Sequence, residues 1–323
     1  MNILVTGVSG FIGYHLAPRL LRAGHNVAGT IRRAGMASAD SKRRLKKIEK
    51  LAEGLPGKFQ VVRCEEYEAL YNTMQKCRPE VCVHLAGKSW VRESIGYPEL
   101  YEEANYKFTA ALLEALRCNG CRRVVLASSV MVYGPEAPLP YMEDQLGGAP
   151  STPYGSSKLA AEVLLNTYRQ LYKLQTASLR LFSVYGPEIR RDCVPFLIAS
   201  SILQKKPFTI FGDGSSMRDY VEIDDVTSAL ELAVNGQESH AALNIGSGFG
   251  TSLLDLLRTI EQCLGTKAEV VYKPAIPGEL TVAIPDISLA MEKLKWEPKV
   301  GLEAGVTRLV EWFRSPDGPQ LKP

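Results

Sequence analysis

Short apolar runs alternate with longer amphipathic segments through roughly the first half of the chain. The longer segments, 11–21, 101–118 and 154–172, carry apolar residues every three or four positions and predict helices. Alternation of this kind is typical of a parallel sheet that is covered by helices on both faces. The runs that predict buried strands are 3–5, 26–31, 81–85, 123–127 and 177–182.

The pattern is less regular after Pro187, where proline and glycine divide the chain into short elements. Segments 221–233 and 243–245 look like a return to the sheet, and 303–313 predicts a last helix. We therefore expect a Rossmann-type, doubly wound α/β fold with a smaller, discontinuous C-terminal lobe that binds the substrate. The expected boundaries are 1–186 with 219–248 for the dinucleotide-binding domain, and 187–218 with 249–323 for the lobe.

A glycine-rich loop follows the first predicted strand. Gly7, Gly10 and Gly13 are spaced by two residues, and Phe11 and Ile12 begin the next helix. Glycines let the backbone approach a pyrophosphate, which the helix N-terminus attracts through its free N–H groups. The spacing differs from the usual Gly-x-Gly-x-x-Gly, so a glycine-rich turn without a ligand is the alternative.

The end of the second predicted strand bears on the choice of nicotinamide cofactor. NAD-binding folds usually place an acidic residue there, on the ribose hydroxyls. This chain has Arg32 and Arg33 instead, and guanidinium groups can bind a 2′-phosphate. The two arginines favour NADP over NAD, and the alternative is two solvated loop charges.

Tyr154 and Lys158 lie four residues apart in Tyr-Gly-Ser-Ser-Lys, so a helix would place them on one face. A free phenol loses its proton near pH 10, which is too high for a base that works near neutrality. A neighbouring ammonium group is expected to lower the pKa of Tyr154. The pair is therefore a candidate proton-transfer group for a sugar or alcohol hydroxyl.

Composition excludes several classes of protein. With 323 residues, 46% apolar residues and a net charge of +3, the chain is typical of a globular protein without a nucleic-acid partner. The basic run from Lys42 to Lys50 predicts a solvated helix and indicates no function. The chain has no membrane-length apolar run, and its strand-like start predicts no signal peptide. Cysteine spacing and four histidines suggest no metal site, and free thiols fit a cytoplasmic protein.

The order and spacing of seven motifs resemble the extended short-chain dehydrogenase/reductases, specifically the NAD(P)-dependent nucleotide-sugar epimerase/dehydratase group. The resemblance covers essentially the whole chain. The motifs are Thr-Gly-Val-Ser-Gly-Phe-Ile-Gly at 6–13, His-Leu-Ala-Gly at 84–87, Ser-Ser-Val-Met-Val-Tyr-Gly at 128–134, Tyr154 with Lys158, Leu-Arg-Leu-Phe-Ser-Val-Tyr-Gly-Pro at 179–187, Arg-Asp-Tyr-Val-Glu-Ile-Asp-Asp-Val at 218–226 and Asn-Ile-Gly-Ser-Gly at 244–248.

The resemblance implies roles for these positions in a site that binds a nicotinamide cofactor and a nucleotide sugar. Ser129 and Tyr154 would be the catalytic hydroxyls, and Lys158 would hold the nicotinamide ribose. The residues implied to bind the cofactor, besides Tyr154 and Lys158, are Gly7, Gly10, Phe11, Ile12, Gly13, Leu85, Ala86 and Gly87.

The resemblance also implies contacts to the substrate. Arg218 would bind the diphosphate of the sugar nucleotide, with a surface salt bridge as the alternative. Ser183 stands where many relatives carry a substrate-binding Asn, and Ser129 would also contact the sugar. Arg190 or Arg191 could face a substrate carboxylate, and ordinary loop charge is the alternative.

The residues after Ser129 bear on the reaction. Dehydratases of the family carry an Asp-Glu pair there, whereas this chain has Val130 and Met131, which cannot transfer protons. We therefore expect a nucleotide-sugar C4 epimerase acting on a UDP-hexose or UDP-uronic acid. An NADPH-dependent 4-keto-sugar reductase is the alternative, followed by a 4,6-dehydratase or a non-catalytic NADP-binding sensor. The family further implies a homodimer, formed by helices near 93–118 and 154–172.

Overall fold

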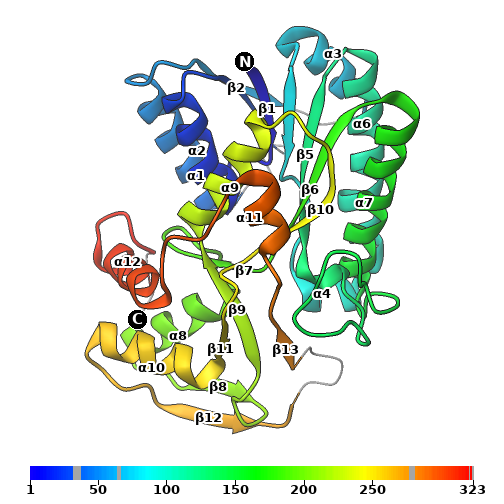
Figure 1. The fold of residues 1–323 in the computed structure, drawn as a ribbon. Helices are drawn as coiled ribbons and strands as arrows, with labels where there is room; N and C mark the ends of the chain where they lie inside the picture. The colour runs from blue at the N-terminus through cyan, green and yellow to red at the C-terminus, as the bar shows by residue number, and fades with distance from the viewer. Residues whose placement is uncertain (32–37, 64–66, 276–280, 320, 322–323) are drawn as a thin grey trace.

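The structure is a computed structural model that describes residues 1–31, 38–63, 67–275, 281–319 and 321 (Figure 1). Among these residues, seven parallel strands form the main sheet in the order β10-β6-β5-β4-β1-β2-β3. The strands are β1 (Asn2–Thr6), β2 (Asn26–Ile31), β3 (Phe59–Arg63), β4 (Val81–His84), β5 (Arg123–Ser129), β6 (Gln175–Leu181) and β10 (His240–Ile245). The Rossmann-type α/β fold predicted from the sequence is confirmed.

Alternate residues of the buried strands pack into two separate apolar cores, one on each face of the sheet, because successive side chains of a strand point to opposite faces. In β1, Ile3 and Val5 join one core, whereas Leu4 joins the core on the other face. The helices that cover the first face are α1 (Phe11–Arg22), α2 (Ala39–Ala52), α9 (Ile223–Asn235) and α11 (Ser288–Leu294). The opposite face is covered by α3 (Tyr67–Cys77), α6 (Phe108–Cys118) and α7 (Pro153–Tyr172).

Short helical elements surround the carboxyl ends of β4 and β5. The segment before α6 is a π-helix, η1 (Glu102–Lys107), and it carries the buried Asn105. The 3₁₀ turn η2 (Val130–Val132) directly follows β5. The two remaining short helices are α4 (Val91–Gly96) and α5 (Pro98–Tyr101).

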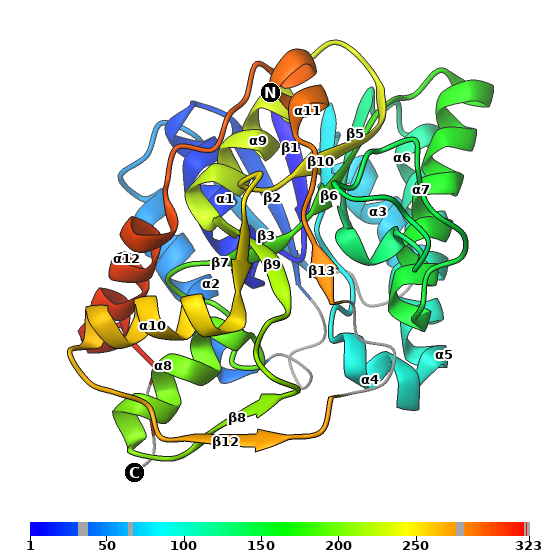
Figure 2. The ribbon, with the colours of Figure 1, turned by 60° about the horizontal axis from the view of Figure 1, so that its bottom comes forward.

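The lobe is built from the second half of the chain and has its own apolar core (Figure 2). One small sheet contains β11 (Gly250–Ser252), β9 (Met217–Glu222) and β13 (Val282–Ala283), with β7 (Ser183–Tyr185) paired to β9. A second contains β8 (Phe208–Phe211) and β12 (Val270–Lys273). The lobe's helices are α8 (Val194–Gln204), α10 (Leu253–Leu264) and α12 (Leu302–Arg314).

The return of the chain to the main sheet differs in detail from the sequence expectation. Only β10, which contains the expected strand at 243–245, joins that sheet. Segment 221–233 lies mostly in α9, and β9 before it belongs to the lobe sheet instead. Within the described residues, no helix is long and apolar enough to cross a membrane.

Candidate active site

The loops that follow β1, β4 and β5 meet at the carboxyl edge of the main sheet, because these strands are parallel neighbours. Thr6, at the end of β1, accepts hydrogen bonds at its hydroxyl oxygen from the backbone N–H groups of Leu85 (3.1 Å) and Ala86 (3.0 Å). Gly87 lies beside Lys158, since a Cβ on this glycine would be 3.6 Å from the Lys158 amine. The structure therefore brings the two predicted cofactor motifs together with Lys158, the predicted catalytic lysine.

The β1–α1 loop fits the pyrophosphate of a dinucleotide. Gly10 is the N-cap of α1 and offers no side-chain acceptor, so first-turn N–H groups of Phe11 and Ile12 are not capped by a side chain. A Cβ at Gly13 would lie 2.6 Å from the Gly7 carbonyl oxygen, so only glycine allows this close turn. The arrangement explains why three glycines stand here despite the unusual spacing.

Helix α7 presents Tyr154 and Lys158 from its first two turns. Thr152 caps the helix by accepting a hydrogen bond from the Gly155 N–H (3.2 Å), and Pro153 occupies the first helical position. A Cβ at Gly155 would lie 2.1 Å from the Met131 carbonyl oxygen, so this glycine lets α7 pack against the η2 turn that follows β5. Tyr154 and Lys158 are 6% and 7% exposed, so both side chains are nearly buried.

The amine of Lys158 is held by the sheet. Its Nζ donates a hydrogen bond to the Ala127 carbonyl oxygen in β5 at 3.0 Å. Burial lowers the pKa of Lys158 to about 8, while the negative charge of Glu162 acts to raise it. A nearly buried ammonium group with remaining N–H donors suits the ribose hydroxyls of a dinucleotide.

The surroundings of Tyr154 differ from the expectation that Lys158 lowers the pKa of this tyrosine. Burial raises the pKa of the Tyr154 phenol, whereas the sequence pattern predicted that Lys158 would lower it. The influences that act to lower this pKa are a hydrogen bond with Ser129 and the positive charge of Arg190. The prediction of direction was wrong because spacing along a helix reveals neither the depth of burial nor that Lys158 is bound to Ala127.

Ser129 and Arg190 thus converge on the phenol from two different segments. The Ser129 oxygen also accepts a hydrogen bond from the Met131 N–H (3.2 Å), which fixes the hydroxyl at the end of β5. Arg190 donates to both carboxylate oxygens of Asp192 (3.0 and 2.6 Å), and its Nη1 contacts the Ser89 hydroxyl.

Other predicted site residues lie in different surroundings. Ser183 opens β7 and is paired in register with Tyr220 of β9, on the lobe sheet. Arg218 lies on β9 and donates to the Met217 and Thr281 carbonyl oxygens (2.9 and 3.3 Å). Arg191 contacts Asp40 at 3.1 Å, so its guanidinium lies at the start of α2, whereas that of Arg190 contacts Asp192 and Ser89.

Arg32 and Arg33, on which the preference for NADP rests, lie outside the described residues, so the structure does not show their surroundings.

Within the described residues, no group of three or more His, Cys, Asp or Glu side chains is placed to hold a metal ion.

A buried polar network behind Tyr154 was missed by the sequence reasoning. Asn105 of η1 donates to the Ser157 oxygen (2.9 Å), and the Ser157 hydroxyl donates to the Tyr154 carbonyl oxygen (2.8 Å). Asn105 also exchanges hydrogen bonds with the backbone of Lys88 (2.8 and 3.0 Å), which ties the loop after β4 to α7. A polar residue within the otherwise apolar face of segment 101–118 is the signal that could have indicated it.

Comparisons with known proteins agree with this geometry. UDP-glucuronate 4-epimerase from Thermodesulfobacterium geofontis is 33% identical over 96% of this chain and 95% of its own length. UDP-glucose 4-epimerase from Mycolicibacterium smegmatis is 35% identical over 98% of this chain and 99% of its own.

Solved structures of UDP-sugar 4-epimerases also resemble this chain. The chain resembles UDP-glucuronic acid 4-epimerase from Bacillus cereus in complex with UDP-glucuronic acid and NAD, with a TM-score of 0.87, 32% identity, and coverage of 97% of this chain and 99% of that one. It resembles UDP-glucose 4-epimerase from Thermotoga maritima with UDP-glucose, with the same TM-score, identity and coverage.

The family model described as the NAD dependent epimerase/dehydratase family matches residues 3–246. The match spans the main sheet, both cofactor loops, the Tyr154–Lys158 pair and Arg218. This chain belongs to that family of NAD-dependent nucleotide-sugar epimerases and dehydratases.

Proposed function

We propose that this protein is a C4 epimerase of a UDP-sugar, with a UDP-uronic acid as the preferred substrate. The observation that carries the proposal is the buried Tyr154, hydrogen-bonded to Ser129 and placed one helical turn before Lys158 at the cofactor edge of the sheet. Val130 and Met131, in the turn after Ser129, supply no acid or base for dehydration.

Tyr154, Ser129 and Arg190 have different roles in the proposed transfer of the C4 hydroxyl proton. Tyr154 must lose its proton to accept that of the C4 hydroxyl, which it later returns to the C4 oxygen of the other epimer. Because burial raises the pKa of Tyr154, this step depends on the Ser129 hydrogen bond and the Arg190 charge, which act to lower it. Ser129 donates to the same oxygen, and Arg190 stabilises the phenolate by its charge. NAD, when bound, would supply the hydride acceptor and donor for C4, and the Gly7–Gly13 loop and Lys158 would hold it beside the sugar.

NAD rather than NADP is the proposed cofactor. The loop geometry at Gly7–Gly13 suits either dinucleotide, and the preference for NADP had only Arg32 and Arg33 in its favour. The solved relatives from Bacillus cereus and Thermus thermophilus are complexes with NAD. Extraction of the purified protein followed by mass spectrometry distinguishes NAD from NADP directly.

Arg190 supports the uronic acid as substrate. Asp192 occupies its Nε and Nη2 groups, and Nη1 contacts the Ser89 hydroxyl. A guanidinium whose charge acts on the proposed base is suited to a carboxylate at C6 of the sugar. The relatives include both UDP-glucuronate and UDP-glucose 4-epimerases, so the two sugars are the natural pair to compare.

The test measures interconversion of UDP-glucuronate and of UDP-glucose with their galacto epimers by the purified protein. We expect turnover without net consumption of cofactor, faster with the uronate. Tyr154→Phe should lower kcat by roughly 10²- to 10⁴-fold while the cofactor is retained. Stoichiometric consumption of NADPH with a 4-keto sugar nucleotide, and no epimer formed, would instead identify the reductase.

A homodimer stays a prediction. Val163, Leu171 and Tyr172 of α7 are 59%, 65% and 48% exposed, and such an apolar surface supports the expected pairing through α6 and α7. Sedimentation or light scattering checks it.

A further inference from the structure

The loop between β7 and α8 holds a carboxylate that the proposed mechanism does not use. Glu188 lies two residues before Arg190, and only 2% of its surface is exposed. Its backbone is in the left-handed region, with φ of 64°, where a side chain other than glycine or asparagine is uncommon. A strained and buried acid of this kind requires strong partners to stay in place.

Helix α2 supplies those partners. Arg43 donates hydrogen bonds to both carboxylate oxygens of Glu188, each at 2.6 Å. Arg44 donates to one of these oxygens at 3.2 Å, and Lys47 lies 3.3 Å from the other. Arg44 also donates to the Glu188 carbonyl oxygen at 2.7 Å, so the backbone as well as the side chain is held. These four residues are called the α2 clasp below.

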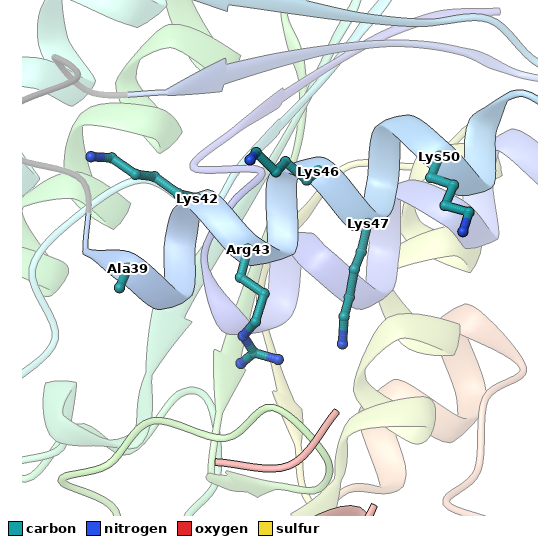
Figure 3. Close-up of a pocket in the computed structure, with 6 residues that line it drawn as sticks. All are labelled: Ala39, Lys42, Arg43, Lys46, Lys47 and Lys50. Atoms are coloured by element: carbon teal, nitrogen blue, oxygen red, sulfur yellow. The ribbon is translucent and has the colours of Figure 1, made fainter. Parts of the chain in front are cut away.

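The clasp gives a function to part of the basic run that the sequence left unexplained. Figure 3 shows Arg43 and Lys47 pointing to one side of α2, and Lys42 and Lys46 pointing away from that side. Lys47 additionally pairs with Asp317 at 2.9 Å, after α12. The basic residues of α2 therefore serve two different surfaces, and only one of them is solvated.

Further contacts fasten the same loop on both sides of Glu188. His15 of α1 hydrogen-bonds to the Pro187 carbonyl oxygen at 2.8 Å, and Ile189 is buried in the lobe core. Arg191 pairs with Asp40 at the start of α2 at 3.1 Å. Between these anchors, Arg190 is the residue whose side chain turns to Ser89 and the catalytic phenol.

We propose that Glu188 is a positioning residue: clamped by Arg43, Arg44 and Lys47, it fixes the 186–192 loop so that Arg190 reaches Tyr154 and the sugar C6 group. The proposal rests on the proposed function, because it assigns Arg190 to the substrate. Under this proposal, the basic helix α2 affects activity indirectly, by holding the loop that carries Arg190, and does not itself contact the substrate.

The test compares two substitutions on the same helix. Arg43→Gln removes the bidentate partner of Glu188 and leaves Arg44 and Lys47 as its cationic partners. Lys46→Gln removes one positive charge from the same helix and is the matched control, since the Lys46 side chain is exposed and points away from the side that carries Arg43. We expect Arg43→Gln to lower kcat/KM for UDP-glucuronate by about 10- to 100-fold, as expected for misplacement of a substrate-orienting group, and Lys46→Gln to leave it unchanged.

A double-mutant cycle separates positioning from simple stabilisation. If the clasp acts through Arg190, Arg43→Gln should cause little further loss in an Arg190→Gln background, and it should affect UDP-glucose less than UDP-glucuronate. Additive losses in the cycle, or equal losses for both sugars, would overturn the proposal. So would a fall in thermal stability with unchanged kinetics of the folded enzyme.

The outcome for the clasp is distinct from that for the proposed function. An inactive wild-type enzyme with either sugar contradicts the epimerase itself. An active enzyme that loses turnover in Tyr154→Phe, but not uronate selectivity in Arg43→Gln, contradicts the clasp alone.

Discussion

Lys158 has a charge that depends on pH within the range of ordinary assays. It is nearly buried, and burial lowers its pKa to about 8 from the usual value near 10.5. A lysine is a cation below its pKa, so the amine that we propose holds the cofactor ribose loses its charge as the pH rises past this value.

We therefore expect kcat/KM to decline above pH 8, by about tenfold per pH unit, because the protonated form of Lys158 falls in that proportion. Steady-state rates between pH 6 and 10 measure the effect. Lys158→Arg is the control, since arginine stays charged over the whole range and should remove the decline even if its longer side chain lowers the rate. The same decline in both proteins would contradict the assignment.

For single residues, the sequence indicated which side chains are candidates for the site, but it did not indicate how deeply they are buried or which distant residues surround them. Ser129, Tyr154 and Lys158 could be proposed from the sequence because motif spacing is a local property of the chain, and the structure places all three at the end of β5 and the start of α7. The pKa of Tyr154 was predicted in the wrong direction because burial and the approach of Arg190 come from segments distant in sequence. Asn105 was missed for the same reason, since its partners Lys88 and Ser157 belong to other elements.

Helix α9 is capped by Glu222, the residue just before its first turn. The side chain of Glu222 accepts the hydrogen bond of the Asp224 N–H at 2.6 Å. The Asp225 carboxylate accepts the N–H groups of Lys299 and Val300, at 3.0 Å each. Glu222 is 1% exposed, and burial raises its pKa to about 7.

A raised carboxyl pKa weakens the fold at high pH. Between about pH 4.5 and 7 the folded state keeps the Glu222 proton and the unfolded state has lost it, so this group's contribution to stability falls as the pH rises. Glu222→Gln, which can still cap α9, should therefore be more stable than wild type at pH 8, by up to about 3 kcal/mol, with little difference at pH 4.5.

Urea unfolding at the two pH values measures this difference in the free energy of unfolding. Glu303→Gln is the control, since Glu303 is an exposed acid in the first turn of α12. A stability difference for Glu222→Gln that does not change with pH would show that the Glu222 carboxyl titrates normally.

Elements with strong local patterns were predicted closely. The strand at 26–31 and the helix at 154–172 match β2 and α7 to within one residue. The lobe was harder, because its strands are short and gain their pairing from distant segments. Val270–Lys273, for example, becomes β12 only by pairing with β8, sixty residues earlier in the chain.

Across the whole molecule, the sheet core and the lobe core share residues. Ile12 of α1 and Val184 of β7 pack against both cores. Trp296 belongs to the sheet core and Trp312 to the lobe core, whereas Trp90 is 52% exposed. The tryptophans therefore report on the two parts separately.

We expect both parts to unfold together, because the shared residues cannot be exposed in one core without disturbing the other. The measurement is urea unfolding followed by fluorescence in Trp90→Phe proteins that retain either Trp296 or Trp312. The two midpoints should coincide with each other and with the loss of helical circular dichroism. A Trp312 midpoint at clearly lower urea would show that the lobe unfolds independently.

The π-helix at 102–107 has a consequence for how related chains can vary in length. A π-turn holds one more residue per turn than an α-helix, so removing a single residue there would let the helix close regularly with its two ends still facing their neighbours. Asn105 would then turn away from Ser157 and Lys88. A one-residue gap in an alignment at this point would mark a protein that has lost the brace behind its catalytic tyrosine while preserving the fold around it.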